Sequence, residues 1–161
     1  MKILIVSDTH GRDDEFDKVL ETEKPFDMLV HCGDVEGREI YIEVAAGCPC
    51  HIVTGNNDFF SDLPREEEFR LGRHKVFLTH GHYYGVSRDL RDLVDEALSR
   101  ECDIVMFGHT HKPLFETRSG VAVINPGSLS YPRQIGRQPS NAVMDLKKDG
   151  SFDVEIRYLD R

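Results

Sequence analysis

The chain has 161 residues, of which 39% are hydrophobic and 30% charged, and its formal net charge is −9. This size and composition predict a single globular domain, residues 1–161, that buries its own core. The negative charge argues against long nucleic acid as a partner, because phosphate backbones are bound by basic surfaces. No apolar run is long enough for a membrane-spanning helix, so no membrane partner is expected.

The first half of the chain alternates apolar strands with amphipathic helices. Strands are predicted at Lys2–Val6, Asp27–His31 and His51–Thr54, and helices at Asp13–Glu23 and around Ile40–Ala45, ending near Gly47. The apolar start is too short for a signal peptide, and it predicts a buried first strand of a cytoplasmic protein. The order of elements predicts a parallel sheet with right-handed crossovers.

The second half is richer in strands. The predicted elements are a hairpin of Phe69–Leu71 and Lys75–Thr79, a helix at Arg88–Arg100 capped by Ser87, a strand at Asp103–Phe107, and antiparallel strands at Leu114–Thr117, Val121–Ile124, Ala142–Leu146 and Phe152–Tyr158. The acidic run Glu66–Glu68 is expected to be a solvated face, and the four cysteines, which include no CxxC pair, are expected to be reduced. The whole pattern predicts an α/β fold in which two mixed sheets pack together with helices outside, a four-layer α-β-β-α sandwich.

Five short polar clusters each follow a predicted strand. They are Asp8-Thr9-His10, Gly33-Asp34, Gly55-Asn56-Asn57-Asp58, His80-Gly81-His82 and Gly108-His109-Thr110-His111. Open α/β sheets bind ligands at the carboxyl ends of their strands. Alternate residues of an extended segment share a face, so each Asp-x-His or His-x-His pair can point the same way. The neighbouring glycines allow the backbone to approach a bound ion closely.

The donors in these clusters are carboxylate, imidazole and amide groups without cysteine, which suits Mn²⁺, Fe, Zn²⁺ or Ni²⁺ rather than a structural zinc. Taken singly, each cluster has an ordinary explanation. A lone histidine at a strand end is usually a hydrogen-bonded structural residue, and a lone Gly-Asp is usually a turn. Five such clusters at strand ends are improbable by chance, so the sequence predicts a metal site.

The five clusters, in this order, resemble the motifs of the calcineurin-like metallophosphoesterase superfamily. With Leu78–His82, Gly108–Pro113 and Asn125–Ser128, the chain resembles its small YfcE-like phosphodiesterases, and the resemblance extends from Met1 to beyond Pro132. It implies the metallophosphoesterase fold and a metal-dependent phosphoric ester hydrolase, most directly a phosphodiesterase acting on a small phosphodiester.

The resemblance also implies a centre of two divalent transition-metal ions, with Mn²⁺ preferred and Fe, Zn²⁺ or Ni²⁺ as alternatives. The ligands it implies are Asp8, His10 and His111 for one ion, Asn56, His80 and His109 for the other, and Asp34 bridging the two. A water or hydroxide that bridges the ions is then the expected nucleophile.

One position departs from the family pattern. The family motif often reads Gly-Asn-His-Asp, with a histidine that assists the leaving group, whereas this chain has Asn57 and small members often have cysteine. Asn57 cannot act as a general acid, although it can donate a hydrogen bond to phosphate. We therefore expect activity that favours acidic leaving groups. His82 is expected either to contact substrate or to support the ligands, and Asp58 either to take part directly or only to orient its surroundings.

Two interpretations remain open for several other residues. Asn125–Ser128 either borders the site or forms a turn between sheets. Arg12 and Arg133 either pair with phosphate or lie solvated on the surface. The histidines outside the clusters, among them His31, are expected to be structural.

Two other functions fit the same motifs. One is a non-catalytic interaction scaffold, because the retromer subunit of this fold resembles these enzymes; the complete ligand set favours an enzyme. The other is a phosphomonoesterase or nucleotide hydrolase with the same metals. A homodimer is also expected, because antiparallel strands near the C-terminus leave an edge or face to cover and the resembled family is commonly oligomeric.

Overall fold

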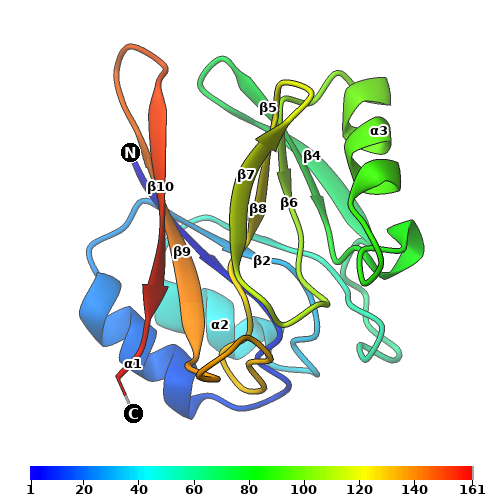
Figure 1. Ribbon diagram of the computed structural model, residues 1–161. Coiled ribbons are helices and arrows are strands. Elements are labelled where there is room, and N and C mark those ends of the chain that lie inside the picture. The colour runs from blue at the N-terminus through cyan, green and yellow to red at the C-terminus, as the bar shows by residue number, and fades with distance from the viewer. Residues whose placement is uncertain (161) are drawn as a thin grey trace.

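Two five-stranded sheets form the centre of the fold in the computed structural model, which describes residues 1–160. The strand order is β10-β9-β1-β2-β3 in the first sheet and β4-β5-β6-β8-β7 in the second. Figure 1 shows the two sheets face to face, with α1 and α2 beside the first sheet and α3 beside the second.

The first sheet contains the strand-helix repeat expected from the first half of the chain. Its strands are β1 (Lys2–Val6), β2 (Met28–His31), β3 (Cys50–Ile52), β9 (Ser140–Leu146) and β10 (Phe152–Tyr158), and its helices are α1 (Asp14–Glu23) and α2 (Glu39–Ala46). The β1, β2 and β3 strands pair in parallel, with Ile3 opposite Met28. The β9–β10 hairpin adds to β1 in the antiparallel direction. The predicted parallel unit is confirmed.

The second sheet is built from the middle of the chain. Its elements are β4 (Glu66–Leu71), β5 (His74–Thr79), a 3-10 turn (His82–Tyr84), α3 (Arg91–Ser99), β6 (Ile104–Met106), β7 (Leu114–Arg118) and β8 (Val121–Asn125). The β5, β6 and β8 strands run parallel, while β4 and β7 are antiparallel edge strands. The predicted antiparallel strands therefore belong to two hairpins in different sheets, and β8 is also the parallel neighbour of β6.

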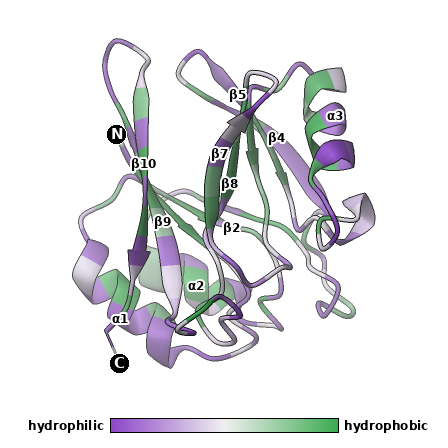
Figure 2. Cartoon of the chain, viewed as in Figure 1, coloured by the Kyte–Doolittle hydropathy of each residue, from purple (hydrophilic) through white to green (hydrophobic). Residues whose placement is uncertain are grey.

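Three apolar clusters hold the layers together. Ile3 of β1 and Leu78 of β5 belong to the cluster between the sheets. Phe16 of α1 packs with Leu4 on the outer face of the first sheet, and the outer face of the second sheet packs against Leu93 of α3. The inner strands, such as β1, β6 and β8, are thus buried on both faces, whereas the edge strands β4, β7 and β10 are partly exposed. In Figure 2, β2 and β8 appear mostly hydrophobic while α3 alternates. The four-layer α-β-β-α sandwich is confirmed.

Several element boundaries differ from the sequence-based expectation. The predicted helix over Arg88–Arg100 begins only at Arg91, and its N-cap is Leu90 rather than Ser87. The predicted strand over Phe69–Leu71 is longer, because β4 includes the acidic run. The third strand begins and ends earlier than expected, at Cys50–Ile52.

The four cysteines are free thiols, as expected, with Cys32 and Cys102 buried and Cys48 and Cys50 half-buried. Among residues 1–160, no helix is both long enough and apolar enough to cross a membrane.

Candidate metal centre

The five polar clusters meet at one edge of the sandwich. Each lies just past the carboxyl end of a strand: two follow β1 and β2, one follows β3, and two follow β5 and β6. Because β1 to β3 are parallel, and β5 and β6 are parallel, the strands of each sheet present their carboxyl ends together. This is where the sequence predicts a ligand site.

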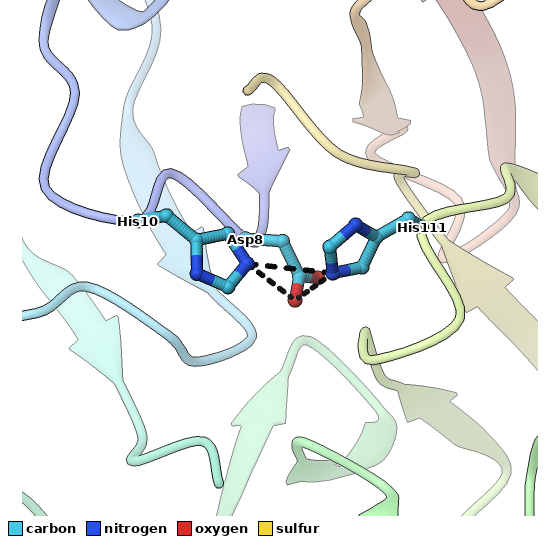
Figure 3. A group of neighbouring side chains, drawn as sticks. All are labelled: Asp8, His10 and His111. Atoms are coloured by element: carbon cyan, nitrogen blue, oxygen red, sulfur yellow. Dashed lines mark hydrogen bonds and ion pairs between the residues drawn. The ribbon is translucent and has the colours of Figure 1, made fainter. Parts of the chain in front are cut away.

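The first group of donors consists of Asp8, His10 and His111, whose ligand atoms lie within 4.8 Å of one another. The His111 Nε2 atom is 3.1 Å from Asp8 Oδ1, and His10 Nε2 is 3.7 Å from the same oxygen. The two Nε2 atoms are 3.4 Å apart. Figure 3 shows both imidazole rings directed at the carboxylate from opposite sides.

The second group is centred on Asn56. The side-chain oxygen of Asn56 lies 3.0 Å from His80 Nε2 and 3.0 Å from His109 Nδ1. The rings of the two histidines are 5.2 Å apart, centroid to centroid. Amide oxygen and two imidazoles from three loops thus converge on one point.

Asp34 lies between the two groups. Its Oδ2 atom is 3.7 Å from His10 Nε2 and 3.5 Å from His80 Nε2. Asp8 Oδ1 is also 3.8 Å from His80 Nε2, and Asp8, Asp34 and His80 form a second compact group. The geometry therefore offers two carboxylates in bridging range, of which Asp34 lies closer to His80, while Asp8 also lies 3.1 Å from His111.

In three of the histidines, the Nδ1 atom, which faces away from the ligand cluster, lies beside an oxygen acceptor. His80 Nδ1 lies 2.7 Å from the carbonyl oxygen of Cys32, and His111 Nδ1 lies 2.7 Å from that of Tyr131. His10 Nδ1 lies 2.8 Å from the carboxylate of Glu36. Such contacts fix the ring orientation and leave Nε2 free to bind a metal, as is usual for metal-binding histidines.

Five of the seven candidate ligands have a left-handed backbone. The φ angles are +53° at Asp8, +49° at His10, +61° at Asp34, +69° at His109 and +57° at His111. Non-glycine residues rarely adopt this region, and such strain concentrates at functional sites. The pairs Asp8 with His10 and His109 with His111 are therefore brought together by left-handed turns and not by the extended backbone that was expected.

Glycines make room for the ligand side chains. A Cβ added at Gly55 would lie 2.1 Å from Asp34 Oδ1, and one at Gly108 would lie 2.1 Å from Ser7 Oγ and 2.7 Å from Asp8 Oδ2. The backbone at these two glycines closely approaches the carboxylates of Asp34 and Asp8. Any larger residue at either position would displace a candidate ligand.

The electrostatics fit a cation. Asp8 Oδ1 is buried and has no hydrogen-bond donor, although three histidine Nε2 atoms surround it. Burial alone opposes ionisation, but His111 and the nearby His80 lower the pKa of Asp8 to about 2. Burial lowers the pKa of His109, which favours the neutral, ligating form of that ring. An orphaned carboxylate oxygen facing imidazoles fits divalent metal ions.

Asn57, Asp58 and His82 lie beside the ligands. The Asn57 side chain donates to Asp34 Oδ2 at 2.9 Å, and its backbone N–H donates to Oδ1 at 2.8 Å. Asp58 accepts from the backbone N–H groups of Asp34 and Gly55, at 2.8 and 2.7 Å. This is the backbone-orienting role allowed for Asp58. The His82 ring lies 5.4 Å from that of His80, and its buried Nδ1 has no partner among the described residues.

Several residues outside the predicted ligand set support Asp8 and the neighbouring Gly108 loop, and of these Ser7 and Ser130 were not expected from the sequence. Ser7 Oγ donates to Asp8 Oδ2 at 2.6 Å. Ser128 and Ser130 donate to the Asp8 carbonyl oxygen at 2.8 and 2.7 Å. Asn125 donates to the Gly108 carbonyl oxygen at 3.1 Å. The 125–130 loop thus both borders and supports the site. Only the position of Ser7 next to Asp8 was a local signal, because the other contacts join distant parts of the chain.

Comparison with known proteins agrees with this geometry. Residues 1–149 match the family model of the calcineurin-like phosphoesterase superfamily domain. The probable metallophosphoesterase YsnB of Bacillus subtilis is 34% identical over 164 residues, covering 100% of this chain and 92% of the relative. Phosphodiesterase MJ0936 of Methanocaldococcus jannaschii is 33% identical over 166 residues, covering 92% and 95%. A predicted phosphoesterase from Streptococcus pneumoniae, of solved structure, has a TM-score of 0.84 at 28% identity, covering 98% and 88%.

The chain belongs to the calcineurin-like phosphoesterase superfamily. It is accordingly a metal-dependent phosphoester hydrolase, and the resemblance seen in the sequence motifs is confirmed.

Proposed function

We propose that this chain is a phosphodiesterase whose centre binds two divalent transition-metal ions, with Mn²⁺ the preferred ion. The proposed ligands are Asp8, His10 and His111 for one ion, Asn56, His80 and His109 for the other, and Asp34 for both. The observation that carries the proposal is the position of Asp34 Oδ2, within 3.7 Å of His10 and 3.5 Å of His80, the two histidines assigned to different ions.

Ions bound at these ligands would supply an acidified water nucleophile and positive charge for the phosphate oxygens. The chain's own residues prepare the site. Asn57 fixes both oxygens of Asp34 through its side-chain and backbone N–H groups. Ser7 and the backbone N–H of His109 hold Asp8 Oδ2, which leaves Oδ1 directed into the site.

The leaving group has no strong acid beside it. Asn57 has no acidic proton to give. Burial lowers the pKa of His82, so that ring is mainly neutral near pH 7 and is a weak proton donor. An alcohol leaving group must then take its proton from water or from the small fraction of His82 that is protonated. The proposed enzyme therefore cleaves esters of acidic alcohols most readily.

A cavity of about 970 Å³ adjoins the first donor group. His10, His111, Tyr131 and Arg133 are among its lining residues. Its volume is suited to a small phosphodiester rather than a polymer. Arg133 brings a guanidinium group, which suits phosphate oxygens, to the cavity wall. The free thiols agree with a reducing compartment, and we include a cytoplasmic location in the proposal.

The test is hydrolysis of bis(p-nitrophenyl) phosphate and p-nitrophenyl phosphate by protein loaded with Mn²⁺, Fe²⁺, Zn²⁺ or Ni²⁺. We expect the diester to have the higher kcat/KM, and chelation to abolish turnover until metal is restored. A preference for the monoester would identify a phosphomonoesterase instead. Absence of turnover with every metal, in protein that binds metal, would favour the scaffold interpretation.

A further inference from the structure

We propose that a cationic cavity beside the metal centre binds a second phosphate group of the substrate, so that the preferred substrate is a phosphodiester with a phosphorylated arm. This inference rests on the proposed phosphodiesterase function and specifies its substrate class.

The cavity has a volume of about 590 Å³ and lies between the 86–90 turn and the segment that follows the last histidine of the centre. Four cationic side chains line the cavity: Arg88, Lys112, Arg118 and Arg133. Apolar residues, including Leu90 and Phe107, also contribute to its lining. The cavity therefore combines positive charge with an apolar wall.

In the described part of the chain, three of the four cationic side chains of the cavity are not held in an ion pair. Within residues 1–160, the side chains of Arg88, Lys112 and Arg133 make no ion pair, whereas Arg118 is paired with Glu116 at 2.6 Å. Asp89 is the carboxylate in the cavity lining; it is paired with Arg91 at 3.4 Å, and the charge of the neighbouring Arg88 also helps to lower its pKa. Three unpaired cations gather in one cavity of a chain whose net charge is −9. Their mutual repulsion is relieved when an anion binds among them.

The cavity is connected to the metal centre through named residues. Thr110 and Lys112, which line it, are the direct neighbours of His111 in the chain. Arg133 lines both this cavity and the larger one that contains His10 and His111. The backbone N–H of Arg133 donates to the His111 carbonyl oxygen at 2.9 Å, which fixes its position beside the centre.

These relations define the ligand chemistry. When the ester phosphate of a substrate is bound at the metal centre, one arm of that substrate extends past Arg133. A second anionic group on this arm reaches Arg88 and Lys112. Guanidinium groups favour phosphate because they can donate two parallel hydrogen bonds to it. A nucleotide ester that carries a further phosphate has the required pair of groups, and a diester with two uncharged arms leaves the cavity unused.

The test compares thymidine 5′-(p-nitrophenyl phosphate) with its 3′-phosphorylated counterpart. Both release the same leaving group, so the ratio of their kcat/KM values reports the added phosphate alone. We expect the phosphorylated substrate to be preferred about tenfold, the scale of a charged hydrogen bond discounted for solvent exposure. Arg88→Gln combined with Lys112→Gln should bring the ratio close to one. Arg70→Gln combined with Lys148→Gln removes two exposed positive charges outside the cavity and should keep the preference.

The possible results separate the two proposals. If wild type cleaves both substrates equally, or if the double variant keeps the preference, the phosphate subsite is wrong and the phosphodiesterase stands. If neither substrate is cleaved, the phosphodiesterase proposal fails, and calorimetry with thymidine 3′,5′-bisphosphate and thymidine 5′-monophosphate decides the subsite. Equal affinities for these two nucleotides would overturn it, and tighter binding of the bisphosphate, lost in the double variant, would support it.

Discussion

Asn57 supports the carboxylate that we assign to both metal ions. Its amide donates to Asp34 Oδ2 while its backbone N–H donates to Oδ1, so both oxygens are held by one residue. A histidine at this position would exchange that support for an acidic proton. Loss of the support for Asp34 should lower kcat/KM for every substrate. An added proton donor should raise kcat/KM only for substrates with poor leaving groups.

Asn57→His should therefore make the rate less dependent on the leaving group. For the wild type, kcat/KM should fall steeply as the pKa of the leaving alcohol rises, because no strong acid assists. General acid assistance is worth about a hundredfold to ten-thousandfold, so the variant should gain most on alkyl diesters and little on nitrophenyl diesters. The measurement is a leaving-group series at saturating metal. Parallel dependences in both proteins would mean that position 57 does not govern protonation.

His31 is a buried neutral histidine rather than a metal ligand. Its Nδ1 accepts from the Gly33 N–H at 3.1 Å, so its proton is on Nε2, which donates to Thr9 Oγ1 at 3.0 Å. Burial lowers the pKa of His31 from 6.5 to about 4. Between these values the unfolded chain binds the proton and the folded chain does not, so stability falls as the pH falls through this window.

We predict that His31 removes about 3 kcal/mol from the free energy of unfolding between pH 6.5 and pH 4, with no further loss below. Urea unfolding of chelator-treated protein across this range measures the effect. His31→Gln should flatten the pH dependence, whatever it does to stability at pH 7. An unchanged slope in the variant would show that other groups cause the acid sensitivity.

At the scale of elements, the acidic strand β4 is tied to its neighbours instead of lying free in water. Glu66 contacts Arg100 at 2.5 Å, Glu67 contacts His51 at 2.6 Å, and Glu68 contacts Lys75 at 2.8 Å. The run is partly exposed, as expected of a surface face, and its acids are in addition paired across strands and with the end of α3. No local pattern in a run of three glutamates reveals such partners.

Arg100 is the main link between α3 and β4. Its guanidinium also contacts Glu96 at 2.8 Å and lies 4.3 Å from the centre of the Phe77 ring. We predict that Arg100→Met lowers the free energy of unfolding by about 1–2 kcal/mol, because a half-buried network is lost. Arg91→Met is the matched control, since its pair with Asp89 is exposed, and it should change stability by less than about 0.5 kcal/mol. Equal effects in denaturant unfolding would contradict the network.

At the start of α3, a separate turn takes the place of the N-cap that the sequence pattern predicts. Ser87 resembles an N-cap, but Arg88 and Asp89 both donate backbone N–H groups to the Gly85 carbonyl oxygen, forming a separate turn. Asp89 Oδ1 then accepts from the Arg91 N–H at 3.0 Å, where the helix begins. The side chain that accepts a hydrogen bond at the start of the helix is therefore Asp89, just before the N-cap Leu90 and two residues beyond the serine that the pattern favoured.

For the whole molecule, apolar periodicity and the order of elements were sufficient to predict the four layers. They also predicted that the five clusters would meet, because the carboxyl ends of parallel strands share an edge. What could not be predicted is long-range support, such as the bonds from Ser128 and Ser130 to Asp8, which join residues more than a hundred positions apart. The apolar pattern also did not predict that the β7–β8 and β9–β10 hairpins belong to different sheets, because the local sequence of a strand does not specify which strand it pairs with.

The homodimer remains a prediction. The β10 strand is an edge of the first sheet, and on α2 the side chains of Ile40 and Val44 are 73% and 77% exposed. Covering an edge or an apolar face is a common reason for association. Sedimentation at micromolar concentration should give twice the chain mass, and a single species at the chain mass would refute the prediction.

The central claim is a centre of two ions that share Asp34. Its most direct test is the number of Mn²⁺ ions retained per chain after loading and gel filtration, for wild type, Asp34→Asn and Asp8→Asn. Asp95→Asn, a change at an exposed acid of α3, is the control. We predict two ions in the wild type and control, one in Asp8→Asn, and neither held tightly in Asp34→Asn. Saturation of the wild type at one ion, or retention of both by Asp34→Asn, would contradict the account.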